Sequence, residues 1–492
     1  MSRYLLKGLC ITLILLFTMS MPGQAQLGPD EWTQYRLNPE NNPVYNRGEM
    51  KDTLNLKLKT ENEIRSTPVV IENNVYVGNH NSGDIYSYNL NNGKLNWKSQ
   101  APNWIHSEII YVNDQLFAGY GNRFFQKDGT RGTEESGLLS LDPQTGEILW
   151  NFETKGEVMP TPAYYKDTVY ITTGDRHLYG VNPETGREKW NLDLGNVVSM
   201  SSPNIKDGIL YVGGGRPQPY TFFAVDLNER EILWKTELEN VMSGLDDVPP
   251  AIYKDLVITT GVEETGEKIE LKEVYDHHGL KETYKEMVRR ISGKTQSDKQ
   301  LCDHKIFAMN TKNGKIVWEK SLGIGEMVPN NKSGAPVVYK DSVLVGSPIT
   351  KKFYSLDVKT GAENWAYHSN VTKAPPAADK GVAYFTDVKG LVYAFDAESG
   401  ELMGKKLVGG KLAPSGPVLM NNHLIVGSQD GNVTVKPTGS ILNKFDDVKG
   451  DESGPEASFV EYSGLVYGVP IGIVLAGIFI VGLIISKRRI NK

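Results

Sequence analysis

Cysteine is scarce in this chain: of its 492 residues, only Cys10 and Cys302 are cysteines. Cys10 lies in an apolar N-terminal segment that we expect to be removed, which leaves Cys302 without an intramolecular disulfide partner. A fold held together by disulfides is therefore excluded. Positive charge is not in excess either, because 53 Lys and Arg stand against 59 Asp and Glu and give a net charge of −6. Nucleic-acid-binding proteins usually carry a basic stripe, so no nucleic acid partner is expected.

Several catalytic and metal-binding motifs are missing as well. The sequence has no Gly-x-Ser-x-Gly elbow, no phosphate-binding Gly-x-x-x-x-Gly-Lys loop and no His-Glu-x-x-His helix. His, Cys and Asp gather at 276–278 and 302–304, but not at the spacing of a zinc site, so no metal ligands are predicted. The glycines at 213–215, followed by Arg216, indicate a turn after a strand, without the helix that an anion site would use.

The longest apolar runs lie at the two ends of the chain. Residues 1–25 have a basic start, an apolar stretch and small residues before the expected cleavage site, which predicts a secretory signal peptide. Residues 466–486 are uncharged and long enough to span a bilayer, and the basic tail 487–492 is expected to stay inside. With a linker rich in acidic residues, Gly and Ser at 446–465, these ends predict a single-pass protein of the cell membrane. Its large N-terminal domain would lie outside and its C-terminus in the cytoplasm.

What the chain has in abundance is an internal repeat. A phrase that begins with Asp or Asn, turns mostly at Thr-Gly or Asn-Gly, and reaches Trp eight residues later occurs six times. A seventh copy at 396–404 has Gly404 in place of Trp, which predicts a weaker packing seam there. Each unit is too small to bury its own apolar face and must stack on its copies. The six tryptophans are Trp97, Trp150, Trp190, Trp234, Trp318 and Trp365.

Each repeat unit reads as four short strands separated by Gly, Asn and Asp turns, which is typical of one antiparallel sheet. Some Trp-to-Trp intervals lie close to the roughly 40–45 residues of a four-stranded propeller blade. Counting the inner strands by their prolines predicts an all-β, eight-bladed β-propeller over residues 53–445, followed by the single C-terminal transmembrane helix. A spare strand at 53–60 is expected to close the ring as the outer strand of blade eight, with 440–445 as the alternative.

The phrase Asp-x-x-Thr-Gly-x-x-x-Trp resembles the tryptophan-docking repeats of pyrroloquinoline quinone (PQQ) type β-propellers, the quinoprotein alcohol dehydrogenase-like superfamily. The resemblance extends over residues 32–445, and the lead-in at 26–52 contains a segment similar to the one that precedes the blades in that superfamily. It implies that the six tryptophans dock one blade on the next, a structural role rather than a ligand-binding one.

The same resemblance raises an enzymatic alternative. The segment 244–250 is similar to the one that carries the catalytic aspartate in quinoprotein dehydrogenases, so Asp246 and Asp247 are the candidates for a catalytic base. Those enzymes also use a pair of adjacent cysteines and a set of calcium ligands, neither of which we find in this sequence. No cofactor is therefore predicted, and PQQ with calcium is kept as the alternative.

Two blades carry insertions. Blade five is expected to hold residues 262–305 between its second and third strands, including a helix at 280–291 whose apolar residues pack on a propeller face. Blade two is expected to carry a mobile surface loop at 123–136. Loops of this kind often carry binding.

The favoured interpretation is a membrane-anchored propeller that serves as a protein-binding or assembly scaffold at the cell surface, with a protein partner on one propeller face. Among its relatives, it resembles the non-enzymatic BamB type of scaffold. One alternative is a PQQ-dependent dehydrogenase that oxidises alcohols or sugars and feeds electrons to the membrane. Another is a surface sensor or adhesin for sugar or peptide. Exposed aromatic residues at the propeller mouth would favour the scaffold, and an acidic, calcium-competent channel pocket would favour the dehydrogenase.

Overall fold

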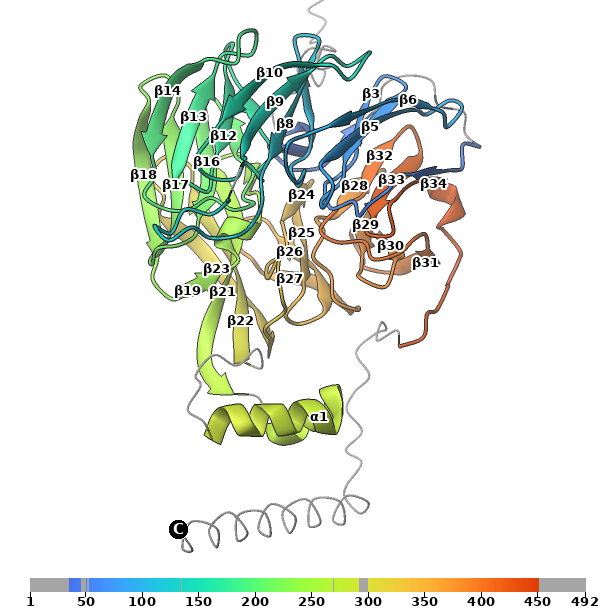
Figure 1. Ribbon diagram of the computed structural model, residues 1–492. Coiled ribbons are helices and arrows are strands. Elements are labelled where there is room, and N and C mark those ends of the chain that lie inside the picture. Colours follow the sequence, from blue (N-terminus) through green and yellow to red (C-terminus); the bar gives the residue numbers. More distant parts are fainter. Residues whose placement is uncertain are drawn as a thin grey trace, which may run out of the picture. The chain divides into compact units, whose positions relative to one another are not determined.

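The computed structural model describes residues 35–45, 50, 53–133, 135–268, 270–291 and 300–450 of the chain. These residues form eight sheets that follow one another in chain order as the blades of a β-propeller (Figure 1). The predicted all-β, eight-bladed fold is confirmed. The expected signal peptide, transmembrane run and basic tail lie outside the described residues. Among the helices of the described part, none is long and apolar enough to cross a bilayer.

The four repeat strands of each blade pair antiparallel in one order. Blades one to four consist of β3 (Val69–Ile71), β4 (Asn74–Gly78), β5 (Asp84–Asn89) and β6 (Leu95–Gln100); β7 (Ile110–Val112), β8 (Gln115–Tyr120), β9 (Gly137–Leu141) and β10 (Ile148–Glu153); β11 (Ala163–Tyr164), β12 (Val169–Thr172), β13 (His177–Val181) and β14 (Glu188–Asp193); and β15 (Asn204–Lys206), β16 (Ile209–Gly214), β17 (Tyr220–Asp226) and β18 (Glu231–Leu238).

Blades five to eight repeat this order, and blades five and eight each have one strand more. They consist of β20 (Ala251–Tyr253), β21 (Leu256–Lys268), β22 (Gln300–Asn310) and β23 (Ile316–Glu326), with β19 (Val241–Ser243) beside β21; β24 (Val337–Tyr339), β25 (Ser342–Ser347), β26 (Lys352–Asp357) and β27 (Glu363–His368); β28 (Ala377–Asp379), β29 (Val382–Thr386), β30 (Leu391–Asp396) and β31 (Leu402–Leu407); and β32 (Val418–Met420), β33 (His423–Ser428), β34 (Asn432–Pro437) and β2 (Leu56–Lys59), with β1 (Val44–Tyr45) beside β32. The helices are η1 (Tyr35–Leu37), η2 (Leu245–Asp247), α1 (Leu271–Ile291) and η3 (Thr438–Ser440).

The burial of the strands follows their place in the blade. An outer strand such as β10 alternates between exposed and half-buried residues, because only one of its faces meets the rest of the fold. A second strand such as β8 is buried on both faces, because a neighbouring blade packs on each side. Most inner strands begin directly after a proline, as at Pro162 and Pro376, where the missing N–H costs the ladder nothing.

The ring closes through β2, which pairs with β34 and places Leu56 opposite Val435. The strand expected at 53–60 is therefore the outer strand of blade eight, as predicted.

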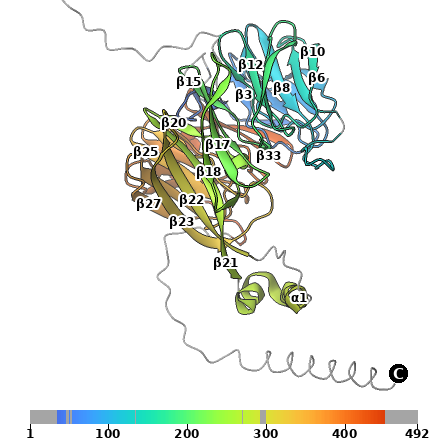
Figure 2. The same ribbon diagram turned by 90° about the vertical axis from the view of Figure 1, so that its left-hand side faces the viewer.

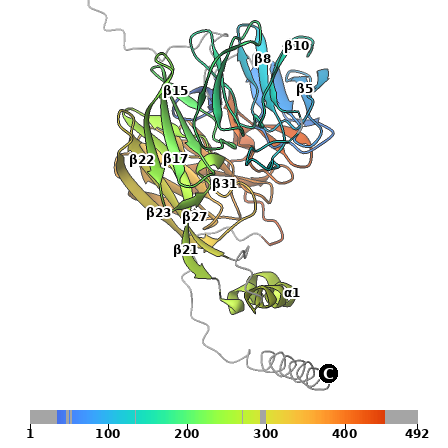
Figure 3. The same ribbon diagram turned by 60° about the vertical axis from the view of Figure 1, so that its left-hand side comes forward.

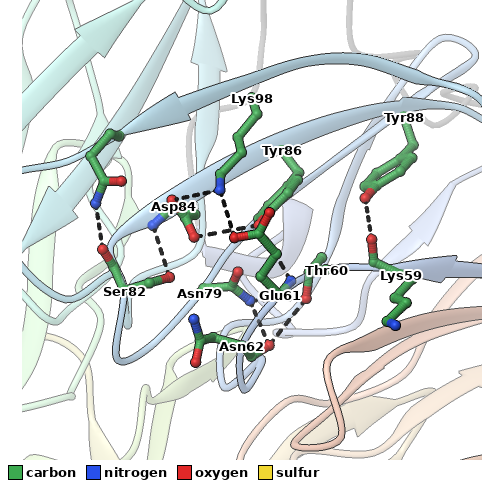
Figure 4. A network of polar contacts seen from close by, with 11 residues as sticks. Lys59, Thr60, Glu61, Asn62, Asn79, Ser82, Asp84, Tyr86, Tyr88 and Lys98 are labelled. Carbon is green, nitrogen blue, oxygen red and sulfur yellow. Dashed lines mark hydrogen bonds and ion pairs between the residues drawn. The ribbon is translucent and has the colours of Figure 1, made fainter.

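A polar network joins this closing strand, which carries no Trp, to blade one (Figure 4). Lys98 Nζ lies 2.9 Å from Glu61 and 3.2 Å from Asp84, and the Tyr88 hydroxyl donates to the carbonyl of Lys59. A Cβ on Gly93 of the blade-one phrase would lie 3.5 Å from both Leu56 and Leu58, so these leucines of β2 take the place that a Trp has at other seams.

Residues 440–445, the alternative closing strand, lie instead beside β31 of blade seven. The Lys405 N–H donates to the carbonyl of Lys444 at 2.6 Å. A Cβ on Gly404 would lie 2.2 Å from the carbonyl oxygen of Ile441, so the glycine that replaces the seventh Trp makes room for this segment. Because Ile441 is fully buried there, the seam that we expected to be weak is covered by the chain itself.

The Trp phrases connect neighbouring blades from both of their ends. Trp318 Nε1–H donates at 3.1 Å to the carbonyl of Val358, the second residue of the next phrase. Gly361 of that phrase has φ of +70°, and a Cβ on it would lie 2.6 Å from the Trp318 ring. The glycine is thus required both for its backbone angle and for the close approach of the indole. The equivalent Trp-to-carbonyl bonds are Trp97–Pro143, Trp150–Pro183, Trp234–Thr311 and Trp365–Ala397. At the remaining phrase Arg230 replaces the glycine and lies over the Trp190 ring.

The lead-in lies inside the channel against the inner strands. Arg36 is buried and donates to the carbonyls of Pro376 and Pro417 at 3.1 and 2.7 Å. Asn41 Nδ2 donates to the carbonyl of Pro336 at 3.0 Å. These three prolines stand at the starts of the inner strands of blades six, seven and eight, so the lead-in fills the channel along this side.

The insertion in blade five differs from the expectation. Strands β21 and β22 pair as far as Lys268 opposite Gln300, so both ends of the expected insertion are strand and only the tip departs from the sheet (Figure 2). Helix α1 occupies that tip and is kinked at Gly279, and it includes the helix expected at 280–291 (Figure 3). The expectation that its apolar residues pack on the propeller is wrong, because several of them are exposed, Ile291 to 79%.

Candidate functional site

The antiparallel order of a blade brings two kinds of loop to one end of the propeller. The connection from an outer strand to the next inner strand and the connection from a second to a third strand both lie at the end where inner strands begin. Six blades contribute such loops to one cavity of about 300 Å³. Its walls are formed by Arg65, His80, His106, Arg123, Phe125, Arg131, Met159, Val197, Ser199, Met200, Arg216, Tyr220, Ser243, Asp246, Asp247, Asn330, Asn331 and Lys332. We call this cavity the axial pocket.

Positive charge dominates the axial pocket. Four arginines and Lys332 line it, against the two carboxylates Asp246 and Asp247. Arg131 is held by Glu157, which is completely buried, and by the Ser199 hydroxyl. Glu157 therefore fixes the Arg131 guanidinium without lining the pocket itself.

Arg123 links opposite parts of the pocket rim. Its guanidinium donates to Asn330 Oδ1 at 2.9 Å, across more than 200 residues of sequence. The loop that carries it, expected to be mobile, is held by the side chain of Asn122, which bonds Thr133 Oγ1 and O at 3.0 and 2.7 Å. The N–H of Arg131 also donates to Gly174 O at 2.9 Å. The blade-two insertion therefore forms a wall of the axial pocket, and these hydrogen bonds hold it in place.

Asp246 and Asp247 both lie on η2 and line the pocket. The carbonyl of Asp246 accepts the N–H groups of Met200 and Ser201 at 2.7 and 2.8 Å, and Asp247 Oδ2 accepts the N–H of Lys332 at 3.0 Å. Burial raises the pKa of Asp246 well above the usual range of a carboxyl, and repulsion from Asp247 raises it further, while Arg131 lowers it. Asp246 is thus placed to take up and release a proton near neutral pH.

The glycines at 213–215 make room for η2. Gly213 and Gly214 belong to β16, so the turn expected there begins later than predicted. A Cβ on Gly213 would lie 2.3 Å from the Leu245 carbonyl oxygen, and one on Gly215 would lie 2.4 Å from Asp246 Oδ2. The absence of side chains at 213–215 therefore lets η2 and the Asp246 carboxyl approach the backbone of blade four.

Two histidines form the opposite wall. The rings of His80 and His106 lie 4.8 Å apart at right angles, and both side chains are buried. Burial, together with the smaller effect of nearby positive charges including Arg65, lowers the pKa of His80 to about 2 and the pKa of His106 to about 3. Within the described part of the chain, neither Nδ1 atom has a hydrogen-bond partner. Neutral imidazoles of this kind can donate to an anion without adding charge.

The pocket narrows towards the lead-in. A smaller cavity of about 40 Å³ shares Arg65, His106 and Asp247 with it and extends to Pro375. The carbonyl of Pro375 lies 3.4 Å from the Arg36 guanidinium of the lead-in. The axial pocket therefore ends against the lead-in inside the channel.

The donor set does not fit calcium. No group of three His, Cys, Asp or Glu residues that could hold a metal ion occurs among the residues described by the structure. The two carboxylates of the pocket share it with five cationic side chains, which repel a divalent cation. The acidic, calcium-competent pocket that the dehydrogenase alternative requires is thus not what the described channel shows.

His304 and Cys302 on β22 are buried and contribute to the packing of the blade. His304 lies between two hydroxyls, with Nδ1 2.8 Å from Ser347 Oγ and Nε2 2.8 Å from Ser333 Oγ. Burial raises the pKa of the Cys302 thiol to about 11, which keeps it protonated. The side chains at 276–278, the other polar cluster of the insertion, lie outside the described ones.

Exposed aromatic residues lie at the rim. Phe124 and Phe125 expose 54% and 50% of their surface, and the Phe124 ring packs 5.6 Å from Trp104. Phe125 also borders an outer groove of about 690 Å³, which continues past Arg216 to Met242. This apolar rim is the feature that the scaffold interpretation requires.

Two of the pocket residues were predicted from the sequence as site residues, and the others were not. Asp246 and Asp247 were candidates and both line the pocket. The cations escaped notice because they come from separate blades and form no motif. Lys332 adjoins Asp247. Arg131 lies in the charged insertion of blade two, and that insertion was the feature of the sequence that could have indicated a site.

Comparison with known proteins agrees with this fold. The sequence model of the family described as outer membrane protein assembly factor BamB matches residues 116–238 and 203–435. The chain is 24% identical to tetrathionate hydrolase from Acidithiobacillus ferrooxidans over 376 residues, 72% of this chain and 68% of that protein. It is 22% identical to outer membrane protein assembly factor BamB from Burkholderia pseudomallei over 382 residues, 75% of this chain and 82% of that protein. The quinohemoprotein alcohol dehydrogenase from Comamonas testosteroni has a similar fold, with a TM-score of 0.56, 12% identity, and coverage of 86% of this chain and 83% of that one.

Proposed function

This chain belongs to the PQQ-like β-propeller repeat family described as outer membrane protein assembly factor BamB, and we propose that it binds and hydrolyses a small anion in the axial pocket. One propeller fold carries many activities, so the argument rests on the pocket and not on the family.

The observation that carries the proposal is the charge of the axial pocket. Five cationic side chains face a cavity of about 300 Å³ together with only two carboxylates. In a partly enclosed site such an excess raises the local concentration of anions. The volume lies at the lower end of small-molecule sites, so the ligand is a compact anion. Tetrathionate, named in one relative, is a doubly charged anion of this class.

Asp246 supplies the second part of the proposal. Hydrolysis needs a group that accepts a proton from water and returns it to the leaving group, and this works best when its pKa lies near the working pH. Asp246 has its pKa raised by burial and lies in the pocket wall with Arg131 near enough to affect it. The cations hold the substrate while Asp246 moves the proton.

Calorimetric titration of the purified full chain with tetrathionate, sulfate and phosphate tests the binding step. We expect saturable binding that weakens with salt, and about tenfold weaker binding in Arg216→Gln and in Lys332→Gln. Lys235→Gln removes one charge from outer strand β18 and should leave binding unchanged. If the folded protein bound none of these anions, the proposal would be refuted.

Turnover is tested separately by following the loss of tetrathionate. Asp246→Asn should keep binding and lose turnover, whereas Asp247→Asn should affect turnover less, because its carboxylate already accepts the Lys332 N–H. Binding without turnover of any anion would reduce the proposal to an anion-binding or sensory role.

The scaffold is the second proposal, favoured by the exposed Phe124 and Phe125 and by the outer groove beside them. In this proposal a protein partner docks on that rim, and the run at 466–486 anchors the propeller outside the cell membrane. Photo-crosslinkers at Phe124 on intact cells would capture one defined partner, while the same crosslinker at Leu149 on outer strand β10 would not. Cleavage of the propeller by protease added to whole cells tests the expected topology.

A further inference from the structure

Helix α1 presents an apolar stripe to solvent. After the kink at Gly279 its residues Leu280, Tyr284, Val288 and Ile291 are spaced four, four and three apart, which places them on one face. They are exposed by 59%, 60%, 44% and 79%. Four neighbouring apolar side chains on one helix face are not the scattered exposure that protein surfaces usually show.

After the kink, the buried residue among the described side chains of α1 is polar, whereas before the kink it is the apolar Val274. Glu286 is exposed by only 1% and pairs with Arg290 Nε at 2.9 Å within the helix. Folded soluble helices bury their apolar stripe and expose their charges, and here the order is reversed. The apolar stripe is therefore not covered by the described part of this chain, and we look for its binding partner elsewhere.

Basic residues flank the stripe. On a helix, Lys281 and Lys285 follow one edge of the stripe and Arg290 follows the other, while Glu286 lies away from it. Between 280 and 291 four basic residues stand against two acidic ones. An apolar stripe bordered by long basic side chains is the pattern of a helix that lies in a membrane surface, since the ammonium groups reach the headgroups while the apolar residues enter the acyl boundary.

We propose that the second half of α1 binds the surface of an anionic lipid bilayer with the stripe Leu280, Tyr284, Val288 and Ile291. Its place at the tip of the β21–β22 hairpin lets it contact a bilayer without altering the blades. The expected anchor at 466–486 would keep a bilayer within reach, because the 15 residues from 451 to 465 span at most roughly 50 Å. A second copy of the chain would be a poorer occupant, because both stripes are bordered by positive charge.

Depth measurement on the full chain in lipid nanodiscs tests the proposal. In a Cys10→Ala, Cys302→Ala background, an environment-sensitive fluorophore is attached at Tyr284→Cys or at Val317→Cys, a control residue exposed by 52% on β23. Discs contain phosphatidylcholine alone or with phosphatidylglycerol, with or without a quencher on the acyl chains. We expect quenching of about twofold at position 284 in anionic discs, little in neutral discs, and none at position 317.

Charge reversal sharpens the test. Lys281→Glu with Lys285→Glu should abolish the quenching at position 284, whereas Lys235→Glu on β18 should not. Equal exposure of both labels to water in anionic discs would overturn the proposal. So would a label at 284 that is shielded without lipid in a dimeric fraction, since a second copy would then cover the stripe.

Discussion

Substituting Gly361 by Ala tests the account of how blades are joined. Gly361 has φ of +70° and lies against Trp318 of the preceding blade, so an added Cβ would approach the indole to 2.6 Å. A left-handed angle costs an alanine roughly 1 kcal/mol, and forcing a methyl group into a filled contact costs about 1–3 kcal/mol more. We expect Gly361→Ala to lower the free energy of unfolding by about 3 kcal/mol.

Gly381 provides a matched control in the turn between β28 and β29. It has φ of +83°, and a Cβ there would meet nothing within 4 Å. Gly381→Ala should therefore cost only the backbone strain of roughly 1 kcal/mol. The difference between the two variants, about 2 kcal/mol, isolates the contact with the indole.

Equilibrium urea unfolding, followed by circular dichroism, measures both variants on the same chain. In a Trp318→Leu background the contact is removed, and Gly361→Ala should then cost no more than Gly381→Ala. Equal losses for the two glycines in the native background would refute the reasoning, because the repeat glycine would then matter for its backbone angle alone.

Two further predictions concern buried charges. The pKa of Glu157 is raised by burial to about 8, against the lowering effect of Arg131, so the folded state binds a proton more tightly than the unfolded chain. The contribution of Glu157 to stability should therefore be fully present below about pH 4.5 and be lost as pH rises towards 8, and Glu157→Gln should remove this decline from the pH dependence of thermal unfolding. A steeper decline in Glu157→Gln would contradict that sign. Arg36→Met should lower the free energy of unfolding by about 3 kcal/mol, because Arg36 is buried and donates to Pro376 and Pro417. A loss no larger than that of the exposed Lys235→Met would show that the lead-in does not stabilise the ring.

The blades could be predicted because their signals are local. A phrase with an Asp or Asn cap, a turn and a Trp recurs in most units and indicated the blades. The prolines of the inner strands gave the blade count, and a spare strand at 53–60 predicted the closure. The sequence did not show that a glycine of one phrase serves the Trp of the preceding blade, as Gly361 serves Trp318. That contact joins two copies of the pattern and is visible in neither one.

The pocket and the stripe on α1 could not be predicted for a different reason. Residues as distant as Arg65 and Lys332 meet only because every blade delivers its loops to one end, and charged loop residues are common on any surface. The helix at 280–291 could be predicted from the spacing of its apolar residues. That spacing shows that the apolar residues share one face, but it does not show whether the face packs on the propeller or is exposed. Burial of Glu286 in place of the apolar residues reversed the expected orientation.

The lead-in has a consequence for the order in which this molecule is made. It is synthesised before any blade, yet its partners Asn204, Ile252 and Val338 and the prolines of blades seven and eight emerge later. The ring also waits for its last blade, because β2 pairs with β34. A ribosome-bound chain that ends after blade six contains neither β34, the partner of the closing strand, nor the prolines of blades seven and eight that bind the lead-in. Closure of the propeller is therefore a late event that waits for the synthesis of blade eight, and the early blades must stay soluble until then.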